Sequence, residues 1–225
     1  MKIALEITSI LMFLFFVSLS CQRVIRDIDD NFYSTVKIGQ LEWMAEDLKT
    51  TRYSDGSIII NLISDFDWEM ASEGAYAWYD NDIKNKSLHG ALYNWYAVND
   101  NRGLCPVGWR VATDRDWKTL IEFADGEDTA GGRLKATGTL EERSGLWRYP
   151  NTDAVDEFGF SAIPNGGRLT DGSFGSLGFF AGWWGTSQIG DDFAWTWGIS
   201  YNSGAVRGIY DDKRNGYSVR CVRDI

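Results

Sequence analysis

Alternation of apolar and polar residues dominates the last part of the chain and predicts β-strands there. The alternating runs cover residues 194–200, 205–210 and 217–223. Trp195 and Trp197 share one side of the first run, and Val219 and Cys221 share one side of the last. The Asn, Ser and Gly residues between the runs are typical of tight turns, so the pattern predicts an antiparallel meander.

The first half of the chain mixes helical and strand patterns. Two strand-like runs within residues 35–44 predict a hairpin. Apolar spacing predicts helices over residues 87–98 and 114–124, and Thr113 with Asp116 resembles a capping box at the start of the second helix. Helices early in the chain and a glycine-rich antiparallel sheet late in it define an α+β domain.

The N-terminal segment has a basic start at Lys2, an apolar run over residues 10–17 and small residues before Cys21. The run is too short to span a membrane, so it predicts a secretory signal peptide. Leu-Ser-Cys resembles a bacterial lipoprotein cleavage box, in which the cysteine thiol carries diacylglycerol. The alternative is ordinary secretion with a free Cys21. We therefore divide the chain into a signal peptide at 1–20, a polar tether at 21–30 and one domain at 31–225.

Export changes the meaning of the two other cysteines, Cys105 and Cys221. In an oxidising compartment two remaining thiols usually pair, so the sequence predicts a disulfide between them. The chain-entropy model gives so long a loop a stabilisation of roughly 4–5 kcal/mol. The alternative is a pair of buried free thiols, because cysteine is also a good small apolar residue.

The composition is acidic and rich in aromatic residues. The net charge of −10 leaves no basic footprint for nucleic acid and disfavours contact with anionic lipid, so membrane association is expected only through the lipid anchor. The 225 residues include 11 Trp, 10 Tyr, 12 Phe and 24 Gly but only 3 Pro. This composition favours short strands and ordered loops held by aromatic side chains, most of them in the core.

Several ordered blocks give the chain a family resemblance. They read WMAEDLKTTRY from residue 43, GALYNWYAV from residue 90, CPVGWRVAT from residue 105, FGFSAIP from residue 158 and GYSVRCVRD from residue 216. In this order they resemble the Fibrobacter succinogenes major paralogous domain, which occurs on secreted and surface proteins, chiefly of Bacteroidetes and Fibrobacteres. The layout resembles, more distantly, the C-type-lectin-like fold of formylglycine-generating enzymes. That resemblance implies two helices packed on short antiparallel sheets, with long loops rich in glycine and aromatic residues.

The comparison with formylglycine-generating enzymes argues against catalysis. Those enzymes use thiols, or copper held by thiolates, near an Arg-Gly-Gly-Ser segment, whereas the comparable residues 166–168 have no cysteine near them. Cys105 and Cys221 match scaffold positions instead. His89 is the single histidine, which excludes a multi-histidine zinc site of the usual kind. We therefore expect no enzyme activity, no catalytic residue and no cofactor.

Calcium is the one metal ion for which the sequence offers candidate ligands. Asp80, Asp82 and Asp100, with neighbouring asparagines, could supply oxygen ligands. The sequence lacks the Glu-Pro-Asn, Gln-Pro-Asp and Trp-Asn-Asp motifs with which C-type lectins bind calcium, and such acidic clusters are more often exposed turns. These three residues are weak candidates, and we place no metal site.

A sugar site would pair an exposed aromatic platform with planar polar groups. Trp183 and Trp184, beside Arg168 and Asp191, are the best candidates in the sequence. Adjacent residues of a strand face opposite ways, so one tryptophan should lie in the core and only one could be exposed. The alternative is that loops bury both rings.

These patterns together predict an exported lipoprotein, anchored to the outer membrane, that carries one non-catalytic binding domain. Its expected ligand is a glycan or another surface protein. The rival hypothesis is a structural or accessory subunit, such as the tip of a surface fimbria or adhesin, and a divergent enzyme comes last.

Overall fold

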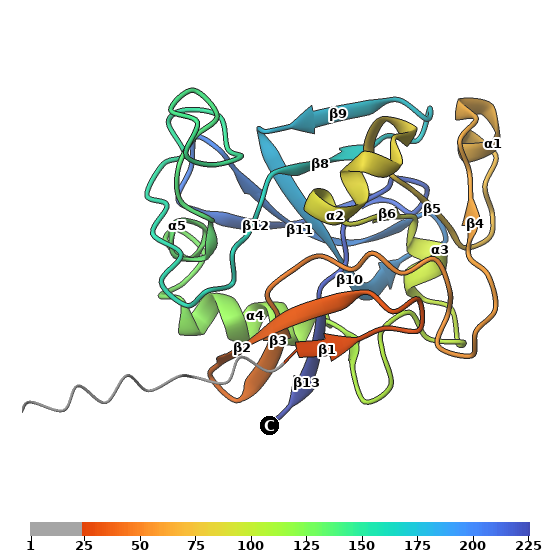
Figure 1. The fold of residues 1–225 in the computed structure, drawn as a ribbon, viewed down its shortest axis with the longest axis horizontal. Helices are drawn as coiled ribbons and strands as arrows, with labels where there is room; N and C mark the ends of the chain where they lie inside the picture. Colours follow the sequence, from red (N-terminus) through yellow and green to blue (C-terminus); the bar gives the residue numbers. More distant parts are fainter. Residues whose placement is uncertain (1–23) are drawn as a thin grey trace, which may run out of the picture.

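A computed structural model describes residues 24–225, which form two five-stranded sheets, a smaller three-stranded sheet and short helices (Figure 1). The first sheet has the order β1-β2-β3-β13-β7, with β1 Val24–Arg26, β2 Phe32–Ile38, β3 Leu41–Met44, β13 Cys221–Asp224 and β7 Arg110–Val111. The second has the order β12-β11-β10-β8-β9, with β12 Val206–Asp212, β11 Phe193–Ser200, β10 Phe180–Ile189, β8 Asn165–Arg168 and β9 Phe174–Leu177. The third joins β4 Ile60–Asn61, β5 Ala75–Ala77 and β6 Leu92–Tyr93.

Five α-helical segments and two 3-10 turns connect these sheets in the described part of the chain. They are α1 Asp65–Glu69, η1 Tyr79–Asn81, η2 Ile83–Asn85, α2 Lys86–His89, α3 Trp95–Val98, α4 Asp114–Phe123 and α5 Ala130–Leu134. The α+β class predicted from the sequence is confirmed, although the sheets dominate and only α4 is longer than two turns.

β2 and β3 form the hairpin that the sequence predicts. Thr35 pairs with Met44, and Ile38 pairs with Leu41. Gly39 in the connecting turn has a φ of 62°, a left-handed conformation that costs glycine least. All four residues of β3 are buried, because β2 and β13 cover its two edges and the core covers its faces.

The predicted C-terminal meander is wrong for its last strand. β11 and β12 do pair antiparallel, with Trp195 opposite Tyr210. The last strand leaves this sheet and, as β13, pairs with β3 and β7 in the other one. Val219 and Cys221 do share one core cluster, as their alternation indicates. Local alternation identifies the buried face of a strand, but it cannot say which sheet the strand joins.

The single helix predicted over residues 87–98 is also wrong. The segment ends a first helix at His89, turns through Gly90, adds β6 and starts again as α3. Gly90 has a φ of 72°, and a Cβ placed there would lie 2.9 Å from the carbonyl oxygen of Leu48. This close backbone contact breaks the helix, and it outweighs the helical spacing of the apolar residues.

Helix α4 begins as the sequence predicts. The Thr113 side chain accepts a hydrogen bond from the Asp116 backbone, and the Asp116 side chain accepts one from the Thr113 backbone, which completes the capping box. Arg110 forms an ion pair with the same carboxylate. Burial acts to raise the pKa of Asp116, but hydrogen bonds from Arg110 and Thr113 outweigh it and hold that pKa below the ordinary value of 3.8.

We predict that Asp116→Asn lowers the free energy of unfolding at neutral pH by about 1 kcal/mol, because it removes a negative charge from the first turn of α4 and from the ion pair with Arg110. Because the folded-state pKa lies below the unfolded one, the carboxylate stabilises the fold above the unfolded pKa, and this contribution disappears as the pH falls through the folded value. Urea unfolding at neutral and acidic pH measures both quantities. A difference between the two proteins that did not shrink in acid would contradict this account.

The tether predicted at 21–30 is wrong from Val24 onwards, because these residues belong to the folded domain. β1 pairs with β2 through three residue pairs, from Val24 opposite Ser34 to Arg26 opposite Phe32. Asp27 is 6 % exposed, and its carboxylate accepts a hydrogen bond from the Tyr33 hydroxyl at 2.6 Å. The predicted signal peptide and Cys21 lie outside the described residues.

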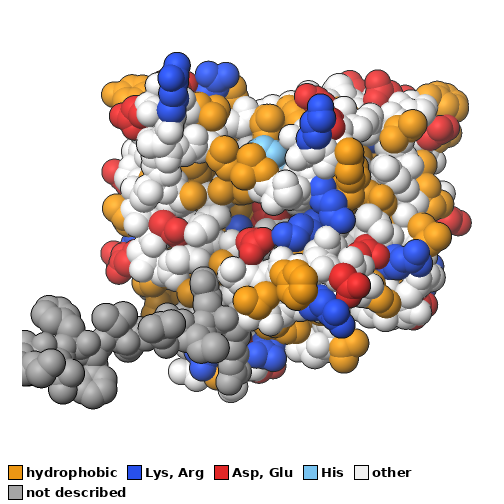
Figure 2. All heavy atoms as spheres, viewed as in Figure 1, with side chains coloured by type: hydrophobic (Ala, Val, Ile, Leu, Met, Phe, Trp, Pro, Cys, Tyr) orange, Lys and Arg blue, Asp and Glu red, His pale blue; other side chains and the backbone are white. Residues whose placement is uncertain are grey.

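Aromatic side chains fill the core, as the composition indicates. Trp43, Trp117, Phe160 and Trp183 pack in one cluster between α4 and the two large sheets, with ring centroids 5.3–6.0 Å apart. A second cluster surrounds the disulfide and includes Trp184. On the outside, basic and acidic side chains alternate across the face shown in Figure 2, with apolar side chains between them.

Candidate functional site

The sugar site predicted from the sequence does not form. Trp183 and Trp184 are each 0 % exposed, because β10 is an inner strand with both faces covered. Arg168 is also fully buried, and its guanidinium donates to the Gly172 carbonyl at 2.8 Å. Asp191 lies exposed in the turn between β10 and β11. Since neither ring reaches the surface, the expectation of one exposed tryptophan is wrong and the alternative of two buried rings holds.

The three weak calcium candidates are not gathered into one site. Asp80 lies exposed in η1, and the Asp82 carboxylate caps η2 by accepting a hydrogen bond from the Lys84 backbone. The Asp100 carboxylate pairs with the Arg102 guanidinium at 2.7 Å. Among residues 24–225, no group of three or more His, Cys, Asp or Glu residues is placed to hold a metal ion.

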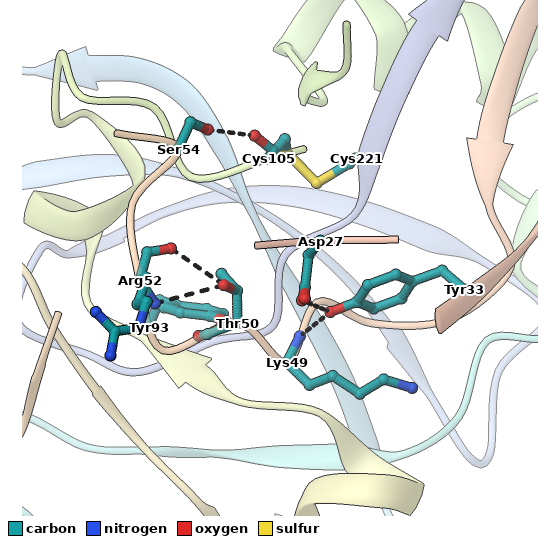
Figure 3. The surroundings of a disulfide bond; sticks show 9 residues. All are labelled: Asp27, Tyr33, Lys49, Thr50, Arg52, Ser54, Tyr93, Cys105 and Cys221. Carbon is teal, nitrogen blue, oxygen red and sulfur yellow. Dashed lines mark hydrogen bonds between the residues drawn. A yellow bond between two sulfur atoms is a disulfide. The ribbon is translucent and has the colours of Figure 1, made fainter. Parts of the chain in front are cut away.

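The disulfide between Cys105 and Cys221 is confirmed (Figure 3). The two Cα atoms are 5.9 Å apart, within the ordinary range for a disulfide. Cys221 lies on β13, whereas Cys105 lies in the loop before β7, so the bond fastens that loop to an inner strand of the first sheet. The Ser54 hydroxyl donates to the Cys105 carbonyl at 2.5 Å and holds the loop from its other side.

Asp47 and Arg220 belong to a buried polar network whose members all have partners within the fold. Asp47 and Arg220, 4 % and 1 % exposed, form an ion pair. The Trp183 indole donates to the same carboxylate at 2.8 Å, and the Asn165 amide donates to its second oxygen. His89, the single histidine, contacts the Asn165 side chain at 3.0 Å through Nδ1. Each group has its partners inside the fold, so this network supports the scaffold.

An exposed aromatic surface does exist, on a different part of the second sheet. We call it the aromatic strip: Phe193 and Trp195 on β11 and Tyr210 on β12. Phe193 is 46 % and Tyr210 45 % exposed, and Trp195 is half-buried. The register places Trp195 directly opposite Tyr210 on one face, with Phe193 two residues further along β11.

Packing holds the strip in a fixed position. The Trp195 ring stacks on buried Trp197, with centroids 5.7 Å apart and planes only 12° from parallel, and Tyr210 lies 4.2 Å away on the other side. The glycine opposite Trp197, Gly208, makes room for both indoles, because a Cβ there would lie 2.9 Å from Trp195. The Lys118 ammonium of α4 lies 6.0 Å from the Trp195 ring centroid. The Trp197 indole donates to the Asp114 carboxylate at the start of α4, so α4 passes along this face over both indoles and leaves Trp195 half-buried.

A second feature is a polar cleft of about 530 Å³ beside α3. Its lining includes Glu73, Tyr96, Asn99, Asn101 and the pair formed by Asp100 and Arg102. Amide, carboxylate and guanidinium groups therefore converge around one half-buried tyrosine ring.

The Tyr53 hydroxyl lies at the wall of this polar cleft. It is buried and forms no hydrogen bond of ordinary geometry with the described residues. A Cβ at Gly74, which lines the cleft, would lie 2.0 Å from this hydroxyl. Burial, together with the nearby Asp100 carboxylate, raises the pKa of Tyr53 to about 12, so the hydroxyl stays protonated and keeps a proton to donate.

The polar cleft and the aromatic strip are linked by charged residues at the ends of β11 and β12. Burial raises the pKa of Tyr96, and the nearby carboxylates of Asp212 and Asp192 raise it further, while Arg214 opposes them. Asp212 is paired with Phe193 across the two strands. The carboxylates that surround the cleft tyrosine therefore also border the strip.

The comparison with protein families agrees with the resemblance in the sequence. The model of the Fibrobacter succinogenes major domain matches residues 36–223. The chain belongs to this family. No curated protein and no solved structure matches the chain. None of the helices in residues 24–225 is long and apolar enough to cross a membrane.

The family blocks quoted from the sequence meet in the buried network of this Fibrobacter succinogenes major domain. Asp47 comes from WMAEDL, Arg220 from GYSVRCV, and Trp183 immediately precedes Trp184 in the WWG segment. These blocks are far apart in the sequence, so the motifs that define the resemblance build the interior.

The aromatic strip was not identified from the sequence, although the alternation of residues along β11 contains a signal of it. Trp195, Trp197 and Ile199 alternate along one strand, and such a stripe is ordinarily a core face. Trp197 and Ile199 do lie in the core, whereas Trp195 is only half-buried. The sequence does not record how completely other segments cover each ring.

Proposed function

We propose that this protein is an exported, lipid-anchored surface protein whose domain binds glycans without chemical turnover. The observation that carries the glycan assignment is the aromatic strip, a fixed and exposed aromatic surface bordered by charged side chains. Export and lipidation rest on the N-terminal pattern that ends at Cys21, and the disulfide is in keeping with an oxidising compartment.

The chemistry of the strip suits a sugar ring. One face of a pyranose presents C–H groups, which pack against a flat aromatic face, while the hydroxyl groups at its edge need hydrogen-bond partners. Trp195 is already held between Trp197 and Tyr210, so little side-chain entropy is lost when a ligand binds. Asp212 and Lys118 at the border can accept from and donate to hydroxyl groups.

The polar cleft provides the complementary kind of contact. Asn99 and Asn101 each offer a planar amide that both donates and accepts, and Asp100 is fixed in place by Arg102. The Tyr53 hydroxyl, beside the Asp100 carboxylate, adds a further polar group behind Gly74 of the cleft. We propose that the cleft binds the more polar part of the glycan.

The non-catalytic part of the proposal rests on the buried charges. Asp47 and Arg220 neutralise each other, and the single histidine is buried against Asn165. Asp47 and Arg220 line a cavity of about 250 Å³, but both carboxylate oxygens of Asp47 already accept hydrogen bonds from the fold, whereas a general base needs a free site that faces its substrate.

We further propose that the domain is a variant of the C-type-lectin-like fold. Three features support this layout: the Trp109 segment leads through β7 into α4, β13 pairs with β7, and a disulfide ties β13 to the loop before β7. A glycan-binding role agrees with such a layout but is argued from the site itself, because fold alone does not determine function.

We predict that Trp195→Ala weakens binding of a glycan selected on an array by at least about tenfold, or roughly 1.4 kcal/mol, because a rigid central tryptophan is a typical binding hot spot. The measurement is isothermal titration of the mature protein made soluble by Cys21→Ser. Trp195 is half-buried on the surface, so the circular dichroism spectrum should remain that of the native fold.

Tyr149→Ala serves as the matched control, since Tyr149 is 67 % exposed on the segment between α5 and β8. Full glycan affinity in Trp195→Ala would exclude the strip as the site. A native protein that bound no glycan on the array, yet copurified with fimbrial subunits, would favour the rival structural role.

A further inference from the structure

We propose that one face of the domain, built around β1 and the disulfide-bearing loop, lies against the bilayer that holds the lipid anchor. We call it the anchor face: Val24, Arg26, Ile28, Arg52, Ile58 and Val107. The proposal rests on lipidation of Cys21, which is part of the proposed function, and it specifies how the domain sits on the membrane.

The length of chain between anchor and fold carries the argument. Val24, the first residue of β1, follows Cys21 by three positions. Even a fully extended chain spans only about 3.3–3.6 Å per residue, so β1 begins within about 10–11 Å of the lipidated cysteine. β1 is an edge strand fixed to β2, so the domain has almost no tether. Whatever surrounds the start of β1 must lie near the lipid headgroups.

Exposed apolar side chains surround that point. Val107 is 91 %, Ile58 66 %, Val24 58 % and Ile28 45 % exposed. Ile28 and Val107 line the same cavity of about 260 Å³ beside the disulfide. Scattered apolar residues are normal on protein surfaces, but apolar residues beside a lipid anchor can insert at the headgroup boundary and gain burial there.

The loop that presents Val107 is held rigidly. Cys105 ties it to β13, and the Ser54 hydroxyl donates to the Cys105 carbonyl. Figure 3 shows Asp27, Arg52, Ser54 and Cys105 around this part of the fold. A loop that is already fixed loses less conformational entropy on contact with lipid than a free loop does.

The charges of the anchor face also fit a phospholipid surface. Arg26 and Arg52 line the same cavity, and their side chains are 62 % and 44 % exposed. Arginine pairs well with phosphate, and its apolar stem can lie in the interface. Asp30 and Asp29 pair with these arginines at 3.2 and 3.3 Å, so the face is locally balanced in a protein whose net charge is −10. The acidic remainder of the domain would then point away from the lipid.

The test uses the full-length lipidated protein in vesicles of phosphatidylethanolamine and phosphatidylglycerol. Cys21 carries lipid and Cys105 is bonded to Cys221, so an introduced cysteine is the free thiol available for labelling. An environment-sensitive fluorophore on Val107→Cys should show blue-shifted emission, quenched by brominated lipid. The same label on Tyr149→Cys should show neither effect, because the adjacent residue Arg148 is hydrogen-bonded to Gly178, between β9 and β10 of the second sheet, whereas β1 belongs to the first.

Three outcomes decide the proposal. Identical, unquenched spectra at both positions in a protein shown by intact mass to carry lipid would overturn it. A Cys21→Ser protein should lose the signal, and a signal that persisted would show that chain length does not set the contact. Intact mass without diacylglycerol on Cys21 would remove the premise, whereas glycan binding by the soluble protein tests the other half of the proposed function independently.

Discussion

Replacing Cys105 and Cys221 together by serine is expected to lower the free energy of unfolding by about 2–5 kcal/mol, the usual cost of deleting a native disulfide from a secreted domain. The bond joins residues 116 positions apart and ties the loop before β7 to β13. For a domain of this size the loss corresponds to a fall in melting temperature of about 5–15 °C. Guanidinium unfolding and calorimetry under identical conditions measure both.

The matched control separates the crosslink from the chemistry of serine. Both cysteines are buried, at 4 % and 0 % exposure, so serine also places hydroxyl groups in an apolar core. The double alanine variant lacks those hydroxyl groups and should still lose most of the stability. If the alanine variant and the reduced native protein unfolded like the oxidised protein, the crosslink would contribute nothing.

Asp47→Ala is expected to have a comparable effect, about 3–5 kcal/mol, because it leaves a buried cation without its partner. Arg220 would lose its ion pair, and the Trp183 indole would lose its acceptor at 2.8 Å. Arg220 would keep its hydrogen bonds to the Met44 and Phe160 carbonyls, at 2.9 and 2.8 Å, which fix it in place but do not balance its charge. Denaturant unfolding of the soluble protein measures the loss.

Two further variants serve as controls for the Asp47→Ala prediction. Asp128→Ala breaks an ion pair with Arg207 whose side chains are 88 % and 56 % exposed, and we expect no measurable change in stability. Asp47→Leu combined with Arg220→Met removes both charges and should recover part of the loss seen in Asp47→Ala. If Asp47→Ala were as stable as Asp128→Ala, the network would not hold the family blocks together.

Sequence patterns predicted local structure correctly where a residue type has a single common structural role, such as glycine in a turn or threonine at the start of a helix. Gly39 permits the turn of the β2–β3 hairpin, and Thr113 with Asp116 caps α4. The pairing of Cys105 with Cys221 was predicted because the chain has only these two cysteines besides Cys21. The turn and the helix cap depend on residues close together in the sequence, and the disulfide was predicted from the number of cysteines.

Sequence patterns failed where contacts with segments distant in the sequence determine whether a helix continues or a side chain is buried. Gly90 breaks the predicted helix because the Leu48 backbone passes against it, a contact between segments 42 positions apart in the sequence. Trp183 and Trp184 were read as a candidate platform, yet both are buried because β10 has neighbours on both edges and cover on both faces.

By itself, the sequence determined the α+β class, the family, the disulfide and the alternation that marks each buried face. Only the tertiary structure decided which sheet β13 joins, how far each tryptophan of β11 is buried and how soon the folded domain begins after Cys21. Periodicity records how a segment divides between core and solvent. It does not record which other segment provides the cover, and that choice leaves Trp195 half-buried and Trp183 fully buried.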